Sequence, residues 1–167
     1  MRASLIAAGV VAAASAAAAA SFFWELPKRA MPAPQPAVVR VADGAKAPLS
    51  PPSGWALVHF WAGWCGPCRR ELPELVRAAK RNGVPLVLVS LDRSLDDAKA
   101  ALSSLAPDAD QALAYWDAAH AARRAYAIRA LPTTYLVRDG RIAARAIGPR
   151  DWRAPAAWSI LPESERR

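Results

Sequence analysis

The stretch that decides the fold reads Val58-His59-Phe60-Trp61-Ala62-Gly63-Trp64-Cys65-Gly66-Pro67-Cys68. It starts within an apolar run, Trp55 to Ala62, of the kind that forms a buried strand in a parallel sheet. It ends in a segment, Pro67 to Arg81, that predicts a helix, because proline suits a first helical turn and the following Asn82-Gly83 suits a helix end. The sequence therefore predicts a buried strand that leads directly into a helix, with two cysteines at the junction.

The rest of the chain continues this alternation. Ser94 is the expected N-cap of a second helix, because Asp96 and Asp97 would lie favourably in its first turn. Further strands are predicted at Val84 to Leu91, Ala112 to Trp116, Thr133 to Val137 and Arg141 to Ala146, and further helices at Ala118 to Tyr126 and Asp151 to Ile160. This order predicts an α/β fold in which helices flank a central mixed β-sheet, with the domain at residues 55–161 and a charged tail at 162–167.

Residues 1–24 have the features of a signal peptide or a membrane anchor. Arg2 precedes the uncharged stretch Ala3 to Trp24, which matches the roughly 20 residues that cross a bilayer. The small residues Ala18-Ala19-Ala20 favour cleavage, whereas the aromatic group Phe22-Phe23-Trp24 favours anchoring at a membrane interface. Both alternatives place the domain in the periplasm or on the extracytoplasmic face of the inner membrane.

A proline-rich segment, residues 25–54, separates this N-terminus from the predicted domain. Its prolines are Pro27, Pro32, Pro34, Pro36, Pro48, Pro51 and Pro52. Such a composition disfavours a helix and predicts an extended linker, in which Val38 to Val41 could pair as an edge strand.

The strong positive charge does not by itself indicate nucleic acid. The formal net charge is +8 and the sequence pI is about 10.3, but the arginines are scattered and none belongs to a nucleic-acid-binding motif. We interpret the charge as a solvated basic surface, and we expect a monomer without a nucleic-acid partner.

Cys65 and Cys68 are the only cysteines, and their spacing favours redox chemistry. Cys65 would start a helix, where free backbone N–H groups and the helix dipole stabilise a thiolate, the attacking species in disulfide exchange. Cys68 would lie one turn later, close enough to attack the mixed disulfide and release the product. The preceding strand, the following helix and the neighbouring Trp64 make this Cys-x-x-Cys a specific signal.

Other uses of the cysteine pair have less support. A structural disulfide would constrain very little chain, a zinc site would need a second ligand pair, and a peroxidase would need a Thr-x-x-Cys before a helix. A copper-delivery module using both cysteines and a histidine stays open as the second hypothesis. The sequence predicts no resident metal and no cofactor.

The opening stretch resembles the active-site region of thioredoxins. Its continuation, Arg69-Arg70-Glu71-Leu72-Pro73-Glu74-Leu75, is closer to the exported TlpA/ResA-like branch, in which Cys-Arg-x-Glu-x-Pro is usual. Leu131-Pro132-Thr133-Thr134-Tyr135-Leu136-Val137 is similar to that branch's cis-proline segment, and Gly148 to Trp152 resembles its closing Gly-x-x-Asp-Trp. The resemblance, which spans roughly Trp55 to Trp158, implies a thioredoxin fold and an exported thiol–disulfide oxidoreductase.

The resemblance also implies roles for individual residues. Pro132 would follow a cis peptide bond and face the cysteine pair, which would turn the backbone of Leu131 outward to pair with a substrate peptide. Trp64 would shield the reactive sulfurs, and Gly66 and Pro67 would contribute to the same substrate-binding surface.

The implied partners are client proteins with cysteine pairs. The implied direction is reduction, for example in cytochrome c or oxidase maturation. Because the periplasm is kept oxidising, such a reductase needs electrons from a membrane donor of the DsbD/CcdA type.

Two polar residues near the motif are harder to interpret. Thioredoxins carry a buried aspartate six residues before the first cysteine, where this chain has His59. Its imidazole could take the proton of Cys68 or, if protonated, favour a thiolate, but a neutral histidine hydrogen bonded within the sheet explains the position equally well. We interpret Glu71 as a solvated glutamate, with tuning of the cysteines or partner binding as the alternative.

Overall fold

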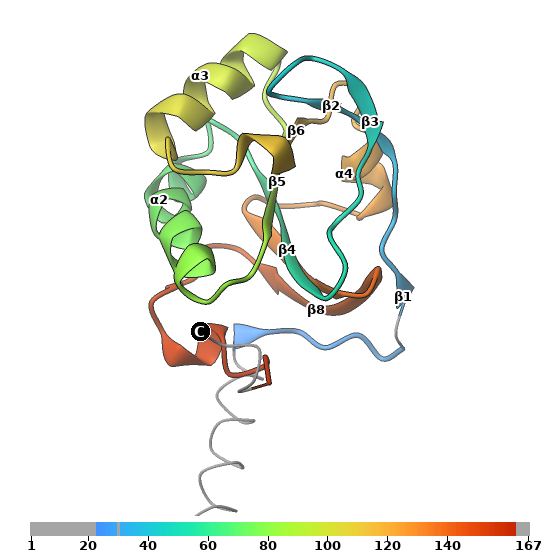
Figure 1. Cartoon of the computed structure of the whole chain (residues 1–167), viewed down its shortest axis with the longest axis vertical. Helices are drawn as coiled ribbons and strands as arrows, with labels where there is room; N and C mark the ends of the chain where they lie inside the picture. Colours follow the sequence, from blue (N-terminus) through green and yellow to red (C-terminus); the bar gives the residue numbers. More distant parts are fainter. Residues whose placement is uncertain (1–22, 30, 163–167) are drawn as a thin grey trace, which may run out of the picture.

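The fold is built on one mixed β-sheet, in which the strands lie in the order β1-β8-β7-β4-β5-β6-β2-β3 (Figure 1). The computed structural model describes residues 23–29 and 31–162. The strands are β1 (Met31–Pro32), β2 (Ala37–Arg40), β3 (Lys46–Pro48), β4 (Trp55–Trp61), β5 (Leu86–Ser90), β6 (Ala114–Trp116), β7 (Thr133–Arg138) and β8 (Arg141–Ile147). The helices are α2 (Gly66–Arg81), α3 (Leu95–Leu105) and α4 (Ala121–Ala125), with 3₁₀ turns η1 (Gln111–Leu113) and η2 (Pro155–Ala157).

β4 lies in the middle of the sheet, where its parallel part meets its antiparallel part. It pairs in parallel with β5 and antiparallel with β7, so hydrogen bonds occupy both of its edges. Every residue of β4 after Trp55 is buried, which explains why the segment is almost continuously apolar. β4 ends at Trp61 and α2 begins at Gly66. The predicted strand-to-helix junction is therefore confirmed.

Helices cover both faces of the sheet, as predicted (Figure 1). Phe60 of β4 packs on the face that holds Tyr126, just after α4, with ring centroids 5.0 Å apart. Leu57 and Trp61 belong instead to apolar clusters that include residues of α2. Because side chains alternate along a strand, His59 points to the same face as Leu57 and Trp61. The sheet therefore presents His59 to α2.

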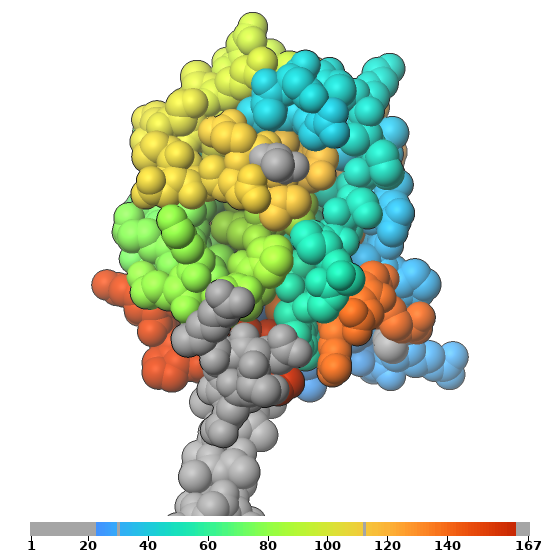
Figure 2. Space-filling view, viewed as in Figure 1, coloured from blue at the N-terminus to red at the C-terminus, as the bar shows by residue number. Residues whose placement is uncertain are grey.

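The proline-rich segment 25–54 is more ordered than the predicted linker, because three parts of it join the sheet. β2 pairs with both β6 and β3, and β1 pairs with β8. Pro32 and Pro48 stand at strand ends, where a missing backbone N–H does not interrupt a ladder. The strand expected at Val38 to Val41 is β2, whereas β3 was not expected. The β2–β3 segment forms a continuous surface with the region around α3 and β6 (Figure 2).

The helix predicted at Ala118 to Tyr126 is shorter than expected. The residue before α4, His120, is exposed and has a φ of 53°, which interrupts a helical backbone. The carboxylate of Asp117 accepts the N–H group of Ala122 at 3.0 Å and that of Arg123 at 2.7 Å. These bonds set the start of α4 at Ala121.

The closing helix predicted at residues 151–160 is wrong, because only the turn η2 forms there. A helix over this segment would need Pro155 to donate a backbone hydrogen bond to Asp151, and proline has no N–H. The indole of Trp158 instead donates to the carbonyl of Trp152 at 2.9 Å, which fixes an irregular turn.

Two aromatic residues that were expected at a membrane interface are buried in the domain. The rings of Phe23 and Trp24 lie 5.2 and 5.8 Å from that of Trp152, and the indole of Trp24 donates to the carbonyl of Ala157 at 3.0 Å. Their packing explains the aromatic residues without a membrane. The rest of the predicted signal or anchor, residues 1–22, lies outside the described residues. No helix within the described part of the chain has the length and apolar character needed to span a bilayer.

We expect Trp24→Ala to lower the free energy of unfolding by about 3–5 kcal/mol, because it leaves a cavity in the aromatic cluster. Urea unfolding followed by far-ultraviolet circular dichroism measures the change. Trp64→Ala is the matched control, since Trp64 is 64% exposed and its removal should cost less than about 0.5 kcal/mol. Equal effects of the two substitutions would contradict the buried position of Trp24.

Candidate active site

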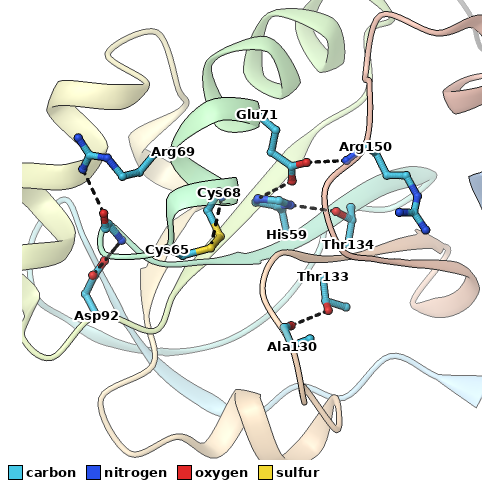
Figure 3. The surroundings of a disulfide bond; sticks show 11 residues. His59, Cys65, Cys68, Arg69, Glu71, Asp92, Ala130, Thr133, Thr134 and Arg150 are labelled. Atoms are coloured by element: carbon cyan, nitrogen blue, oxygen red, sulfur yellow. Dashed lines mark hydrogen bonds and ion pairs between the residues drawn. A yellow bond between two sulfur atoms is a disulfide. The ribbon is translucent and has the colours of Figure 1, made fainter.

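Cys65 caps the N-terminus of α2. Its backbone has the extended conformation of an N-cap, and its Sγ accepts the N–H group of Cys68 at 3.3 Å. The first turn of α2 contains Pro67 and no acidic side chain, so no other negative charge there opposes one on this sulfur. Cys65 and Cys68 form a disulfide, with their Cα atoms 5.3 Å apart (Figure 3).

The two cysteines differ in their access to solvent. Cys65 is 6% exposed and lines a groove of about 400 Å³, whereas Cys68 lies on the buried side of α2 and is fully buried. The predicted substrate-binding residues Trp64, Gly66, Pro67 and Leu131 all line the same groove. An incoming sulfur can therefore meet Cys65 from the groove, while Cys68 approaches it from inside the protein. Trp64 is largely exposed, so it forms an open wall of the groove beside the sulfurs.

The peptide bond between Leu131 and Pro132 is cis, as the resemblance implied. The carbonyl of Pro132 accepts the N–H group of Gly148 at 2.8 Å, which ties this turn to the end of β8. Among the described residues, none forms a backbone hydrogen bond with Leu131. Its N–H and carbonyl groups are therefore free to pair with a bound peptide, which is the role predicted for this position.

Asp92 holds the loop that precedes the cysteine pair, and the sequence analysis did not single it out. Its two carboxylate oxygens accept the N–H group of Gly63 at 2.9 and 3.0 Å, and Ser90 donates to the same carboxylate at 2.8 Å. Arg69 donates to the carbonyl of Gly63 at 3.1 Å (Figure 3). Asp92 follows β5, whose end lies beside that of its parallel neighbour β4. The position of Asp92, directly after a strand predicted to neighbour the one before the cysteines, could have indicated this role from the sequence.

Gly63 also stands where a side chain would not fit. A Cβ atom at this position would lie 2.6 Å from the Cβ of Ala101 on α3, closer than two such atoms can approach. The loop thus passes close to α3, and its backbone is bonded on both sides.

We expect Gly63→Ala to lower the free energy of unfolding by about 1–3 kcal/mol, because α3 or the loop must shift to admit the methyl group. Ala101→Gly in the same chain should recover part of this loss by removing the clash. A double-mutant cycle from urea unfolding measures the coupling between the two positions. Purely additive effects would show that the approach of Gly63 to Ala101 does not matter.

His59 and Glu71 form a buried polar pair next to the cysteines (Figure 3). Nδ1 of His59 lies 2.9 Å from Oγ1 of Thr134, and its Nε2 lies 3.8 Å from Oε1 of Glu71. The other carboxyl oxygen of Glu71 accepts the N–H group of Arg150 at 2.8 Å. The same Arg150 donates from Nε to the carbonyl of Phe23 at 3.3 Å. The prediction that Glu71 is solvated is wrong, because the residue is only 7% exposed.

Burial moves the pKa values of the pair in opposite directions. Complete desolvation lowers the pKa of His59 to about 3, so its imidazole is neutral. Desolvation raises the pKa of Glu71 to about 7, and the N–H group of Arg150 opposes this shift only in part. The protonated histidine considered from the sequence is therefore disfavoured, and the group that titrates near neutral pH is Glu71.

The two shifts have opposite effects on stability. Between about pH 4.5 and 7 the folded protein keeps the Glu71 proton that the unfolded chain has released, so this group makes stability fall as pH rises. Between about pH 3 and 6.5 the unfolded chain binds a proton at His59 that the folded protein does not, so this group makes stability rise with pH.

Single substitutions should separate these effects. Relative to the wild type, the stability of Glu71→Gln should rise from pH 4.5 to 7, and that of His59→Gln should fall from pH 3 to 6.5. The free energy of unfolding of each variant, relative to the wild type, should change by up to about 1.4 kcal/mol per pH unit. Urea unfolding of the oxidised proteins at several pH values measures them, because the disulfide keeps the cysteines from titrating. Three parallel stability curves would contradict the shifted pKa values.

Comparison with known proteins agrees with this geometry. Residues 30–145 match the family model described as the AhpC/TSA family, which covers more than half of the chain. The chain belongs to the AhpC/TSA family of the thioredoxin superfamily. The predicted superfamily is confirmed, and the site is that of a thioredoxin-like protein with a Cys-x-x-Cys pair.

Individual relatives of this AhpC/TSA-family chain are thiol–disulfide exchange proteins by name. The thiol:disulfide interchange protein HelX of Rhodobacter capsulatus is 31% identical over 119 residues, which cover 68% of this chain and 66% of HelX. Sporulation thiol-disulfide oxidoreductase A of Bacillus subtilis is 27% identical over 124 residues, which cover 69% of this chain and 75% of that protein. The chain thus spans just under two thirds of the length of HelX.

Solved structures support the fold. A protein of Chlorobium tepidum described as a DsbE thiol:disulfide interchange protein superposes with a TM-score of 0.65 at 26% identity. The match covers 82% of this chain and 97% of that one. The predicted thioredoxin fold is therefore confirmed.

Proposed function

We propose that this chain is a thiol–disulfide oxidoreductase that reduces disulfides in exported client proteins. The proposal depends on one observation. Cys65, at the N-terminus of α2, lines a groove, and Cys68 is bonded to its sulfur from the buried side. The names of HelX and of the DsbE protein of Allochromatium vinosum, both thiol:disulfide interchange proteins, support the same activity.

The reaction requires two exchanges. In the reduced protein, the Cys65 thiolate attacks one sulfur of a client disulfide, which forms a mixed disulfide and releases the other client sulfur as a thiolate. Cys68 then loses its proton and attacks Sγ of Cys65, which forms the Cys65–Cys68 disulfide and releases the second client thiolate. Two electrons pass to the client, and both client thiolates take up protons.

We place the route for the Cys68 proton at the buried pair. His59 is neutral and lies beside the cysteines, with Nε2 directed toward the carboxyl group of Glu71 (Figure 3). A pKa of about 7 lets Glu71 gain and lose a proton near neutral pH. We assign His59 and Glu71 to the transfer of this proton, and Pro132 and Leu131 to the positioning of the client backbone beside Cys65.

The setting of the reaction follows from the same proposal. Export directed by the N-terminal segment ahead of Phe23, either as a cleaved signal or as an anchor, would place the domain in the periplasm or at the outer face of the inner membrane. Reduction there needs a membrane electron donor of the DsbD/CcdA type to restore the two thiols. The clients would be proteins with cysteine pairs, such as those used in cytochrome c or oxidase maturation.

Substitution of each cysteine tests the proposal. Cys68→Ser should stop the reaction after the first exchange and accumulate a mixed disulfide on Cys65, whereas Cys65→Ser should reduce insulin no faster than the uncatalysed reaction. Non-reducing electrophoresis with mass spectrometry identifies the trapped client, and insulin turbidity gives the rate.

A copper titration of the wild type provides the opposing result. Tight stoichiometric copper binding with no disulfide exchange would replace the proposal with copper delivery. Within the described residues, no three His, Cys, Asp or Glu side chains are grouped to hold a metal.

A further inference from the structure

The arginines of this protein differ in whether a carboxylate neutralises them. Away from the cysteine pair the ion pairs are Arg40 with Asp43, Arg77 and Arg81 with Glu74, Arg138 with Asp139, Arg145 with Glu25, and Arg153 with Asp151. Arg123 and Arg129, by contrast, line the groove beside Cys65 and are exposed. Across the described part of the chain, neither has a carboxylate partner.

The groove contains no acidic side chain to balance these two charges. Its lining consists of Arg123, Arg129 and otherwise uncharged residues. Asp117 lies near Arg123 in sequence, but it is buried, and both of its carboxylate oxygens accept N–H groups at the start of α4. Asp92 is buried as well and bonds to the loop before the cysteines. The carboxylates of Asp117 and Asp92 are therefore already engaged.

Positive charge continues around the cysteine motif. Nη1 of Arg70 lies 3.6 Å from the position that a Cβ atom of Gly66 would occupy, so this guanidinium extends over the turn between the cysteines. Beyond Trp64, a second hollow holds Arg69 and Arg93 together with Asp97. The side of Cys65 that faces Leu131 is thus the one where positive charge is unopposed.

We propose that this groove selects client segments that carry carboxylates within about three residues of the cysteine attacked by Cys65. The inference rests on the proposed function, because it assumes that clients bind beside Cys65, and it adds the chemical class of the client. A carboxylate would take the place of the partner that Arg123 and Arg129 lack.

The spacing of the groove fits an extended acidic segment. The free backbone groups of Leu131 offer a client two hydrogen bonds in the manner of an added strand. Arg129 precedes Leu131 by two residues, and both line the groove beside Cys65. A client segment that pairs with Leu131 beside Cys65 therefore enters the same groove as the guanidinium groups of Arg123 and Arg129.

Matched peptides test the proposal. Three peptides carry the same quenched mixed disulfide and differ only in whether Glu, Gln or Lys flanks the cysteine. With the full-length reduced chain at low ionic strength, the second-order rate should be about tenfold higher for the Glu than for the Lys peptide, with the Gln peptide between them. The ratio should shrink toward one at about 1 M salt, because salt screens exposed charges.

Charge reversal locates the effect. Arg123→Glu/Arg129→Glu should invert the order of the peptides. Lys46→Glu/Lys80→Glu changes the net charge equally at two exposed positions that do not line the groove, so it should leave most of the Glu-to-Lys ratio intact. For each protein, the rate with the uncharged bis(2-hydroxyethyl) disulfide is the reference by which its peptide rates are divided.

The outcomes distinguish the preference for acidic segments from the proposed function. Rapid reduction of the uncharged disulfide with equal rates for all three peptides would overturn the preference and leave the proposed function standing. If Lys46→Glu/Lys80→Glu changed the Glu-to-Lys rate ratio as much as Arg123→Glu/Arg129→Glu does, the preference would come from net charge. That result would overturn its assignment to the groove. Failure to reduce any disulfide would remove the proposed function, and the preference with it.

Discussion

The position of Cys65 at the first turn of α2 is the constraint on which the rest of the site depends. A sulfur at that position accepts a backbone N–H group of the helix and faces outward, and the residue one turn later must then lie beneath the helix. The arrangement holds only if the strand before it is immobile. β4 meets this condition because it is paired on both edges, and Asp92 fixes the short loop between strand and helix.

Burial next to this helix produces a second property of the site. His59 and Glu71 are both desolvated, and each responds by favouring its uncharged form. The core beneath the cysteines therefore holds two ionisable groups without holding a charge at mildly acidic pH. An ion pair at this depth would instead depend on complete hydrogen bonding of both partners.

The sequence predicted the parts of the fold that one local pattern determines. The strand-to-helix junction, the strands β7 and β8 and the Ser94 cap all follow from short stretches with clear periodicity or capping residues. Segment 25–54 was misjudged because proline content suggests a linker, whereas its pairing with β6 and β8 depends on distant residues. Glu71 was misjudged because its charge suggested solvent. Its helical position, three residues after buried Cys68 and four before buried Leu75, indicated the core.

Arg150 links the first described residue of the domain to the buried carboxyl group of Glu71. Its backbone N–H group bonds to the carboxyl group of Glu71, while its guanidinium bonds to the carbonyl of Phe23 and lies 5.8 Å from the centre of that ring. The first described residue of the domain therefore helps to fix the donor that moderates the acidity of Glu71. A displacement of Phe23 would therefore reach the carboxyl group of Glu71 through Arg150 and through the Trp152 ring that Phe23 packs against, without passing through the sheet.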